Sequence, residues 1–230
     1  MQKNTIFYDS YERHRKVGSL IKSSTSILDV GGQLNALAQF CDSPNIVVAN
    51  LKGSEETSDV TIKGKKLPFP KDKFDVVCSI DVLEHIPKSN RKSFIDDLIR
   101  VSKNRVILSF PIGTTEHINY ENKMHKWLKN KDFNIEYLKE HIKLGLPQKS
   151  ELEKILKGRN YKIFYSGDIK INEWLFKLFI FDPKVKFVRK GVYFSKLFFN
   201  YITNPLLYLL LATKDYSKSV NRAYLVINKK

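Results

Sequence analysis

The chain has 230 residues, of which 42% are hydrophobic and 28% charged, and its formal net charge is +16 with a sequence pI near 9.7. These values are those of an ordinary globular protein, and the length is enough for one full hydrophobic core. The excess of Lys and Arg favours anionic partners such as nucleic acid, lipid head groups or phosphorylated small molecules, unless it serves only to solvate the surface.

The two cysteines exclude a disulfide framework or a spaced zinc site. Cys41 and Cys78 each lie alone within an apolar stretch, which is typical of reduced core residues. Residues 1–10 are polar and contain no apolar run, so we expect no targeting segment there. The chain is therefore expected to be cytoplasmic.

In chain order, residues 8–22 carry apolar side chains at helical spacing and predict a leading helix. Short apolar runs then predict seven strands, at residues 26–30, 45–50, 60–62, 75–80, 105–110, 161–165 and 223–228. Helices are predicted at residues 34–40, 90–102 and 149–157. Pro111 is expected to stop the fifth strand.

Buried strands that alternate with helices predict an α/β fold with a mostly parallel seven-stranded sheet and helices on both faces. Ligands of such sheets bind beyond the carboxyl ends of the strands. The active site is therefore expected after Val30, Asn50, Ile80 and Phe110.

Residues 167–222 interrupt this alternation and predict a helical insertion before the last strand. Two aromatic, apolar blocks, 174–181 and 192–211, flank a basic segment. The second block approaches transmembrane length, but Lys196 and two asparagines would have to be buried in lipid. We therefore expect amphipathic helices, which could cap the active site, lie on a membrane surface or bind nucleic acid.

A glycine turn follows the first strand, where Asp29 is succeeded by Gly31 and Gly32. Glycines let a ligand approach the backbone, and Asp29 can accept hydrogen bonds from an amino group. Because the full G-x-G-x-x-G pattern is absent, this turn does not indicate a dinucleotide site.

The segment that follows is the most specific in the chain. Residues 67–87, LPFPKDKFDVVCSIDVLEHIP, resemble the "LPF…FD…VLEHI" segment of class I S-adenosylmethionine (SAM)-dependent methyltransferases. RVS at 100–102 and VILSFP at 106–111 continue the resemblance, which covers residues 8–166. It implies a Rossmann-like methyltransferase domain spanning 1–230, with the 167–222 insertion within it.

The resemblance also implies which residues bind SAM. Asp29, Gly31 and Gly32 would hold the methionyl end, and Asn50 would meet the ribose with Leu51 beside the adenine. The residues implied around the adenine and the sulfonium are Leu67, Ile80, Asp81 and Val82. The chain departs from the family at Gln33, where glycine is usual, and at Asn50, where Asp or Glu is usual. The second departure predicts SAM binding weaker by about 1–2 kcal/mol.

Asp81, Glu84 and His85 would share one face if their segment were helical. The cluster is similar to the Glu-x-x-Glu-His segment of ubiquinone-pathway O-methyltransferases, where it is associated with a divalent metal. Metal-free relatives share the segment too, and hard oxygen ligands alone do not specify a site, so we expect no metal here.

Histidines are the candidate catalytic bases, because an imidazole suits the deprotonation of a hydroxyl near neutral pH. His117 shortly follows Pro111, on a loop expected to face the substrate. His141 lies in KEHIKLGLP, residues 139–147, which resembles an "EH…GLP" stretch of methyltransferases from glycan pathways.

The leading hypothesis is therefore O-methylation of a small molecule, sugar or lipid-linked glycan, with the acceptor beneath the insertion near His117 and His141. The protein is expected in the cytoplasm, where it could also bind the inner face of an anionic membrane. An RNA methyltransferase is an alternative favoured by charge alone, because the chain lacks an Asn-Pro-Pro-Tyr-type motif after the fourth strand. The other alternative is a non-catalytic scaffold, which the departures at Gln33 and Asn50 would support. The sequence leaves the oligomeric state open.

Overall fold

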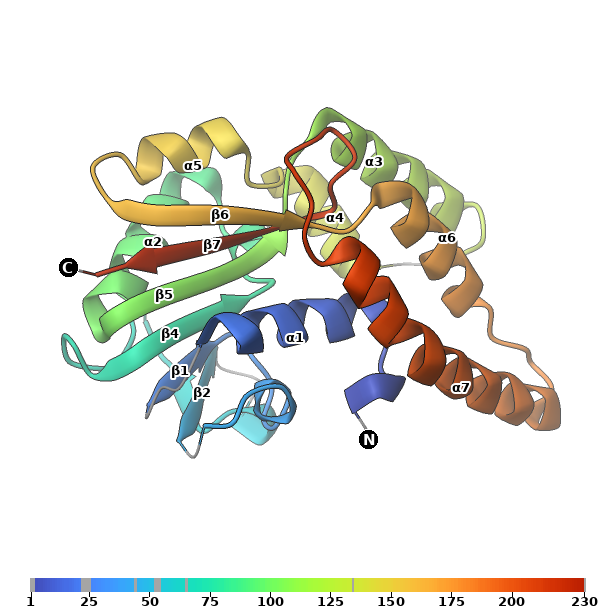
Figure 1. Ribbon diagram of the computed structural model, residues 1–230. Coiled ribbons are helices and arrows are strands. Elements are labelled where there is room, and N and C mark those ends of the chain that lie inside the picture. Colours follow the sequence, from blue (N-terminus) through green and yellow to red (C-terminus); the bar gives the residue numbers. More distant parts are fainter. Residues whose placement is uncertain are drawn as a thin grey trace.

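The computed structural model describes residues 3–21, 26–43, 45–51, 55–64, 66–133 and 135–229. Seven strands form one sheet in the order β3-β2-β1-β4-β5-β7-β6 (Figure 1). Their bounds are β1 Ile27–Val30, β2 Ile46–Leu51, β3 Val60–Ile62, β4 Phe74–Ile80, β5 Ser102–Pro111, β6 Asn160–Ser166 and β7 Arg222–Asn228. All neighbours are parallel except β7, which runs antiparallel to both β5 and β6. The predicted mostly parallel sheet is confirmed.

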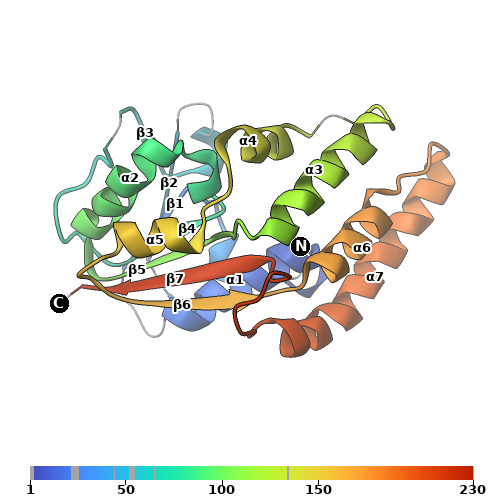
Figure 2. The same cartoon turned by 90° about the horizontal axis from the view of Figure 1, so that it is seen from above.

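Helices cover both faces of this sheet. Five described α-helices precede β6. They are α1 Tyr8–Ile21, α2 Lys88–Val101, α3 Thr115–Lys129, α4 Glu136–Leu144 and α5 Lys149–Ile155. Figures 1 and 2 show α1 on one face and α2 with α5 on the other, while α3 and α4 lie beyond the ends of the strands.

The alternation of side chains along each strand explains this two-sided core. In β5, Val106, Leu108 and Phe110 face the layer that contains α2 and α5. Ile107, between them, packs with Val17 of α1 on the opposite layer. Because successive strand side chains point to opposite faces, an uninterrupted apolar run can be buried only in a sheet covered on both sides.

One predicted helix is wrong. Residues 34–40 form turns and a short 3₁₀ helix, η2 Leu37–Gln39, instead of an α-helix. Asn35 has a left-handed φ of 64°, which a right-handed helix excludes, and Leu37 is the only one of these residues that is buried. The sequence analysis also missed α3 and α4, whose exposed polar faces weaken the helical pattern of apolar residues.

The insertion between β6 and β7 contains two helices, α6 Ile169–Ile180 and α7 Lys186–Leu211. Asp168 caps α6, since its side chain accepts hydrogen bonds from the backbone of Lys170 and Ile171. Both views show α6 and α7 side by side, with the turn between them extending away from the sheet (Figures 1 and 2). No described helix is both long and apolar enough to cross a membrane.

Candidate active site

The carboxyl ends of β1 and β2 bring the predicted cofactor residues together. Gly31 has a φ of 82°, and its N–H donates to the carbonyl of Ala49 at 2.8 Å. A Cβ at Gly31 would lie 2.3 Å from a methyl group of Val82, and one at Gly32 would lie 2.0 Å from the Asp29 carboxylate. Only glycine fits this turn, because real Cβ atoms do not approach so closely.

Asp29 is a buried carboxylate at the base of this turn. Its side chain is 1% exposed, and neither oxygen has a hydrogen-bond partner among the described residues. Burial raises the pKa of Asp29 to about 7. An unpaired buried carboxylate next to a glycine cradle fits a ligand that brings a hydrogen-bond donor or a positive charge, such as the α-amino group of SAM.

Asn50 lies beside the turn and is bonded to it. Its Nδ2 donates to the Gly32 carbonyl at 3.1 Å, and its Oδ1 accepts from the Leu51 backbone at 3.0 Å. A carboxylate could not donate the first of these bonds. The departure from the usual acidic residue therefore has a local role, namely to hold the glycine turn against β2. The Leu51 side chain is exposed.

The remaining predicted cofactor residues lie at the end of β4 and before it. Leu67 is buried in the core, and its backbone N–H donates to Asp97 at 2.6 Å. Ile80 is the buried last residue of β4, and Val82 touches the glycine turn as described. The structure therefore groups Asp29, the two glycines, Asn50 and Val82, whereas Asp81 turns toward a different set of side chains.

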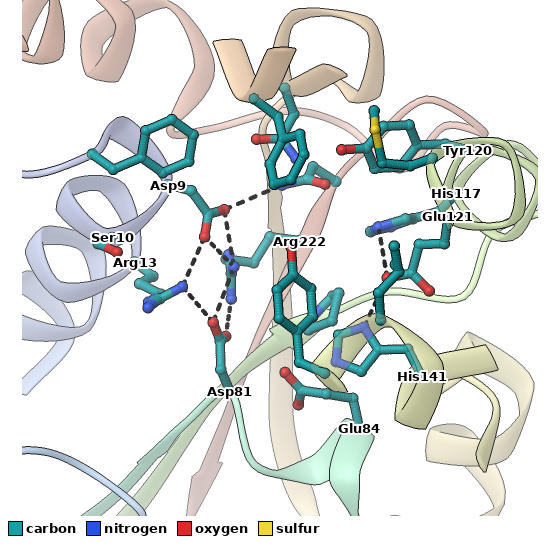
Figure 3. A pocket seen from close by; sticks show the side chains of 18 of the residues that line it. Asp9, Ser10, Arg13, Asp81, Glu84, His117, Tyr120, Glu121, His141 and Arg222 are labelled. Atoms are coloured by element: carbon teal, nitrogen blue, oxygen red, sulfur yellow. Dashed lines mark hydrogen bonds and ion pairs between the residues drawn. The ribbon is translucent and has the colours of Figure 1, made fainter. Parts of the chain in front are cut away.

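Asp81 belongs to a network of two arginines and two carboxylates (Figure 3). Its φ of 55° directs the carboxylate to Arg13 of α1 at 2.5 Å and to Arg222 of β7. Asp9 completes the network, with 2.7 Å to Arg13 and 3.0 Å to Arg222. Burial alone would raise the pKa of Asp9, but the two guanidinium groups outweigh it and lower the pKa to about 2.

This network corrects one expectation. Asp81, Glu84 and His85 do not share a helical face, because the left-handed residue Asp81 precedes the short 3₁₀ helix η4 Leu83–His85 and its carboxylate is taken by the arginines. The cluster that does form joins Glu84 and His85 to His141 of α4, with one potential ligand atom of each within 4.8 Å of the others.

The two predicted catalytic histidines meet around one carboxylate. His141 Nδ1 lies 2.8 Å from Glu121 Oε1, and His117 Nε2 lies 3.9 Å from the same atom. All three side chains are buried. His141 Nε2 has no partner in the described part of the chain, so one ring nitrogen is bonded and the other is open to a proton. Burial lowers the pKa of His117 to about 4.

The stretch that follows His141 is held in place by a buried arginine. Arg91 of α2 is 1% exposed and donates to the Gly145 carbonyl, to the Ile86 carbonyl at 3.0 Å and to Glu151. Gly145 ends α4 with a φ of 74°. Arg91 therefore fixes the turn after α4 against η4, and with it the position of the His141 helix.

A cavity of about 370 Å³ connects the arginine network to the histidines. Its lining comes from α1, η4, α3, α4, α6 and the start of β7. The residues labelled in Figure 3 are Asp9, Ser10, Arg13, Asp81, Glu84, His117, Tyr120, Glu121, His141 and Arg222. The sequence analysis missed Asp9, Arg13, Glu121 and Arg222. The four-residue spacing from His117 to Glu121 on one helix is the signal that could have identified Glu121.

Comparisons with known proteins agree with this architecture. Residues 27–110 match the sequence model of a methyltransferase domain family. None of the curated proteins matches the sequence.

Solved structures of methyltransferases resemble the whole chain. A SAM-dependent methyltransferase from Archaeoglobus fulgidus gives a TM-score of 0.55 at 12% identity, over 96% of this chain and 94% of that one. A possible histamine N-methyltransferase from Thermotoga maritima gives 0.53 at 12% identity, over 99% and 92%. The plantazolicin methyltransferase BpumL, solved with S-adenosylhomocysteine, gives 0.51 at 16% identity, over 96% and 85%.

These findings define the class of fold. The sheet order is that of a Rossmann-like SAM-dependent methyltransferase fold, and residues 27–110 match a methyltransferase domain.

Proposed function

We propose that this chain is a SAM-dependent methyltransferase that transfers the methyl group to a hydroxyl oxygen, with His141 as the general base. The observation that carries the proposal is the buried His141–Glu121 pair, which borders the cavity and leaves Nε2 of His141 without a partner in the described residues. A base that one carboxylate orients through its other ring nitrogen is the arrangement that hydroxyl deprotonation requires.

SAM supplies a methyl carbon that the neighbouring sulfonium activates for displacement. The glycine turn and the unpaired Asp29 carboxylate, at the end of β1, would hold its methionyl end. Asn50 and Leu51 follow on the adjoining strand, where the ribose and the adenine are expected. Leu67 and the backbone around Ile80, Asp81 and Val82 complete the proposed cofactor set.

The protein residues would handle the proton. The hydroxyl proton would pass to His141 Nε2 as the oxygen–carbon bond forms and the sulfur–carbon bond breaks. Glu121 would accept the hydrogen bond from Nδ1–H of His141 throughout and so stabilise the imidazolium. The products are the methyl ether and S-adenosylhomocysteine, so atoms and charge balance.

His117 is better suited to positioning than to proton transfer. Its low pKa, near 4, keeps the imidazole neutral but makes it a weak base. The 3.9 Å separation from Glu121 is also too long for a hydrogen bond. We therefore assign the role of general base to His141 alone, whereas the sequence analysis named both His117 and His141 as candidates.

The acceptor we propose is a hydroxyl compound, either a small molecule, a sugar or a lipid-linked glycan. The cavity supports an acceptor of modest size with a polar end, because carboxylates and imidazoles line it together with Phe7 and Phe176. The glycan class rests on the resemblance of residues 139–147. A reduced location such as the cytoplasm is supported by the free thiols of Cys41 and Cys78.

The first test is calorimetric titration with SAM and with S-adenosylhomocysteine, comparing the native protein with Asp29→Ala. We expect micromolar binding that the variant loses. Folded native protein that binds neither ligand would replace the enzyme hypothesis with the non-catalytic scaffold. Salt-dependent binding of RNA, together with methylation of RNA, would instead favour the RNA methyltransferase.

The second test measures methyl transfer to a panel of hydroxyl acceptors, including sugars and lipid-linked sugars. His141→Ala should lower kcat by about 10²–10⁴-fold while SAM binding stays unchanged. His125→Ala is the matched control, since His125 lies on α3 outside the cavity lining. Equal activity of His141→Ala and the native enzyme would exclude His141 as the base.

A further inference from the structure

The long helix α7 buries two asparagines as well as Leu211 and exposes many apolar residues on its other side. Asn200 and Asn204 are 3% and 0% exposed, and their side-chain amides donate to backbone carbonyls of residues 4–6. On the outer side, Phe198 is 67% exposed and Leu209 is 78% exposed. Helices of globular proteins normally bury their apolar face, so this arrangement indicates that the outer face has a partner.

The exposed apolar surface is concentrated on α6 and α7. Fourteen of the twenty exposed large hydrophobic residues in the described part of the chain lie between residues 174 and 210. The six most exposed of these fourteen are Phe187, Leu209, Leu210, Phe198, Val185 and Phe181, at 61–88%. An apolar patch of this size on a water-soluble surface marks a protein or membrane interaction site.

Positive charge accompanies the apolar residues. Residues 169–211 contain seven Lys or Arg and two acidic residues. Both acidic side chains are paired, Glu173 with Lys177 and Lys123, and Asp182 with Arg189 at 3.1 Å. Lys184, Lys186 and Lys190 are exposed at the turn that extends farthest from the sheet (Figure 1). The surface is therefore both apolar and cationic.

We propose that the outer face of α6 and α7 docks on an anionic lipid bilayer and lies in its interface. Basic residues beside exposed aromatic and aliphatic side chains are the composition of helices that bind membranes in this way. The chemistry is less suited to a second copy of the chain, because a two-fold contact would bring the same cations together. Since no described helix can span the bilayer, the contact is a surface one.

Docking would bring the cavity to the membrane surface. Asn172 and Phe176 of α6 line the cavity, while Trp174 and Leu178 of the same helix are exposed on its outer side. One helix thus separates the site from the proposed lipid contact. An acceptor with a lipid anchor could reach the cavity past this helix without leaving the bilayer. This last step rests on the proposed methyl transfer, whereas docking itself does not.

The test is sedimentation of the full chain with vesicles of phosphatidylcholine alone or mixed with phosphatidylglycerol, without SAM. We expect binding to the anionic vesicles that weakens with salt, and little binding to neutral ones. The variant Lys186→Glu/Lys190→Glu should bind at least about tenfold more weakly. Its control is Lys154→Glu/Lys157→Glu, which makes the same change of charge on two exposed residues, one in α5 and one just after it.

A second measurement distinguishes insertion from electrostatic adsorption. The chain has two tryptophans, so Trp127→Phe leaves Trp174, which is 57% exposed on α6, as the only one. Its fluorescence should shift to the blue on anionic vesicles and be quenched by brominated lipid. Phe198→Ser/Leu209→Ser should weaken binding, whereas Phe133→Ser, an exposed residue outside the surface, should not.

Three outcomes would overturn the proposal. The first is a native chain that stays in solution with anionic vesicles. The second is equal loss of binding in the two charge-reversal variants, which would assign the effect to the overall charge of +16. The third is a stable dimer in sedimentation equilibrium that Phe198→Ser/Leu209→Ser dissociates, because the partner would then be a second copy. None of these readouts depends on SAM or on catalysis.

Discussion

The sheet and the outer helix α7 differ in the side chains that they bury and in those that they expose. At the centre of the sheet Ile107 and Leu108 are completely buried, whereas the residues that α7 buries include Asn200 and Asn204. Burial in the sheet stabilises the fold through the hydrophobic effect. The buried asparagines of α7 instead attach the helix to the N-terminal segment by hydrogen bonds, and Leu211 packs in a core cluster, whereas Phe198 and Leu209 stay exposed. The contrast fits a sheet that serves stability and the proposed docking role of the outer face of α7.

The largest expected effect is in the sheet. Ile107→Ala should lower the free energy of unfolding by about 2–5 kcal/mol, because it removes buried methyl groups and leaves a cavity between β5 and α1. Urea denaturation followed by circular dichroism measures this loss. A cost below about 1 kcal/mol would mean that the layer between the sheet and α1 repacks easily.

Asp29 is the exception within the sheet, since it is a buried charge without a partner in the described residues. Its pKa rises from an ordinary 3.8 to about 7, so between these values the folded protein binds more protons and stability falls as pH rises. Asp29→Asn should remove this dependence, stabilising the protein at pH 7.5 by up to about 4 kcal/mol and having little effect near pH 4. The same variant should bind SAM poorly.

Denaturation of both proteins across this pH range tests the prediction. The difference between them must grow from pH 4 to pH 7. A difference that does not change with pH would show that Asp29 is ionised in the fold and has a partner.

A smaller effect is expected where α7 meets the N-terminal segment. Asn204→Ala removes hydrogen bonds to the carbonyls of Asn4 and Ile6, at 3.0 Å and 2.8 Å, and should cost about 1–3 kcal/mol. Asn122→Ala removes one exposed bond within α3 and should cost less than about 0.5 kcal/mol. Equal losses in the two variants would contradict the anchoring role of Asn204.

The smallest effect is expected on the outer face of α7. Phe198→Ser/Leu209→Ser should change the free energy of unfolding by less than about 0.5 kcal/mol, because both side chains are exposed. Thermal and urea denaturation of the isolated protein are sufficient measurements. A loss above about 1.5 kcal/mol would mean that this face packs against the protein itself, and the contrast with the sheet would disappear.

Much of the sheet follows from local patterns in the sequence. Each of the seven strands is an apolar run, and the two-sided burial of a parallel sheet makes such runs easy to find. The glycine turn is equally local, since the strain at Gly31 and the contact at Gly32 arise from residues next to them and from Val82. Helix α3 was harder, because its apolar residues are few and its buried face is partly polar, with His117 and Glu121.

The sequence by itself therefore determined the class of fold, the glycine turn after β1 and the amphipathic nature of the insertion, because each depends on neighbouring residues. Only the tertiary structure decided how the site is assembled. Arg222 pairs with Asp9, which is 213 positions away in the sequence, and with Asp81, which is 141 positions away. Glu121 is bonded to His141 and not to His117, although His117 is nearer in the sequence. Such pairings depend on which strands and helices end at the same edge of the sheet, and no spacing in the sequence specifies that geometry.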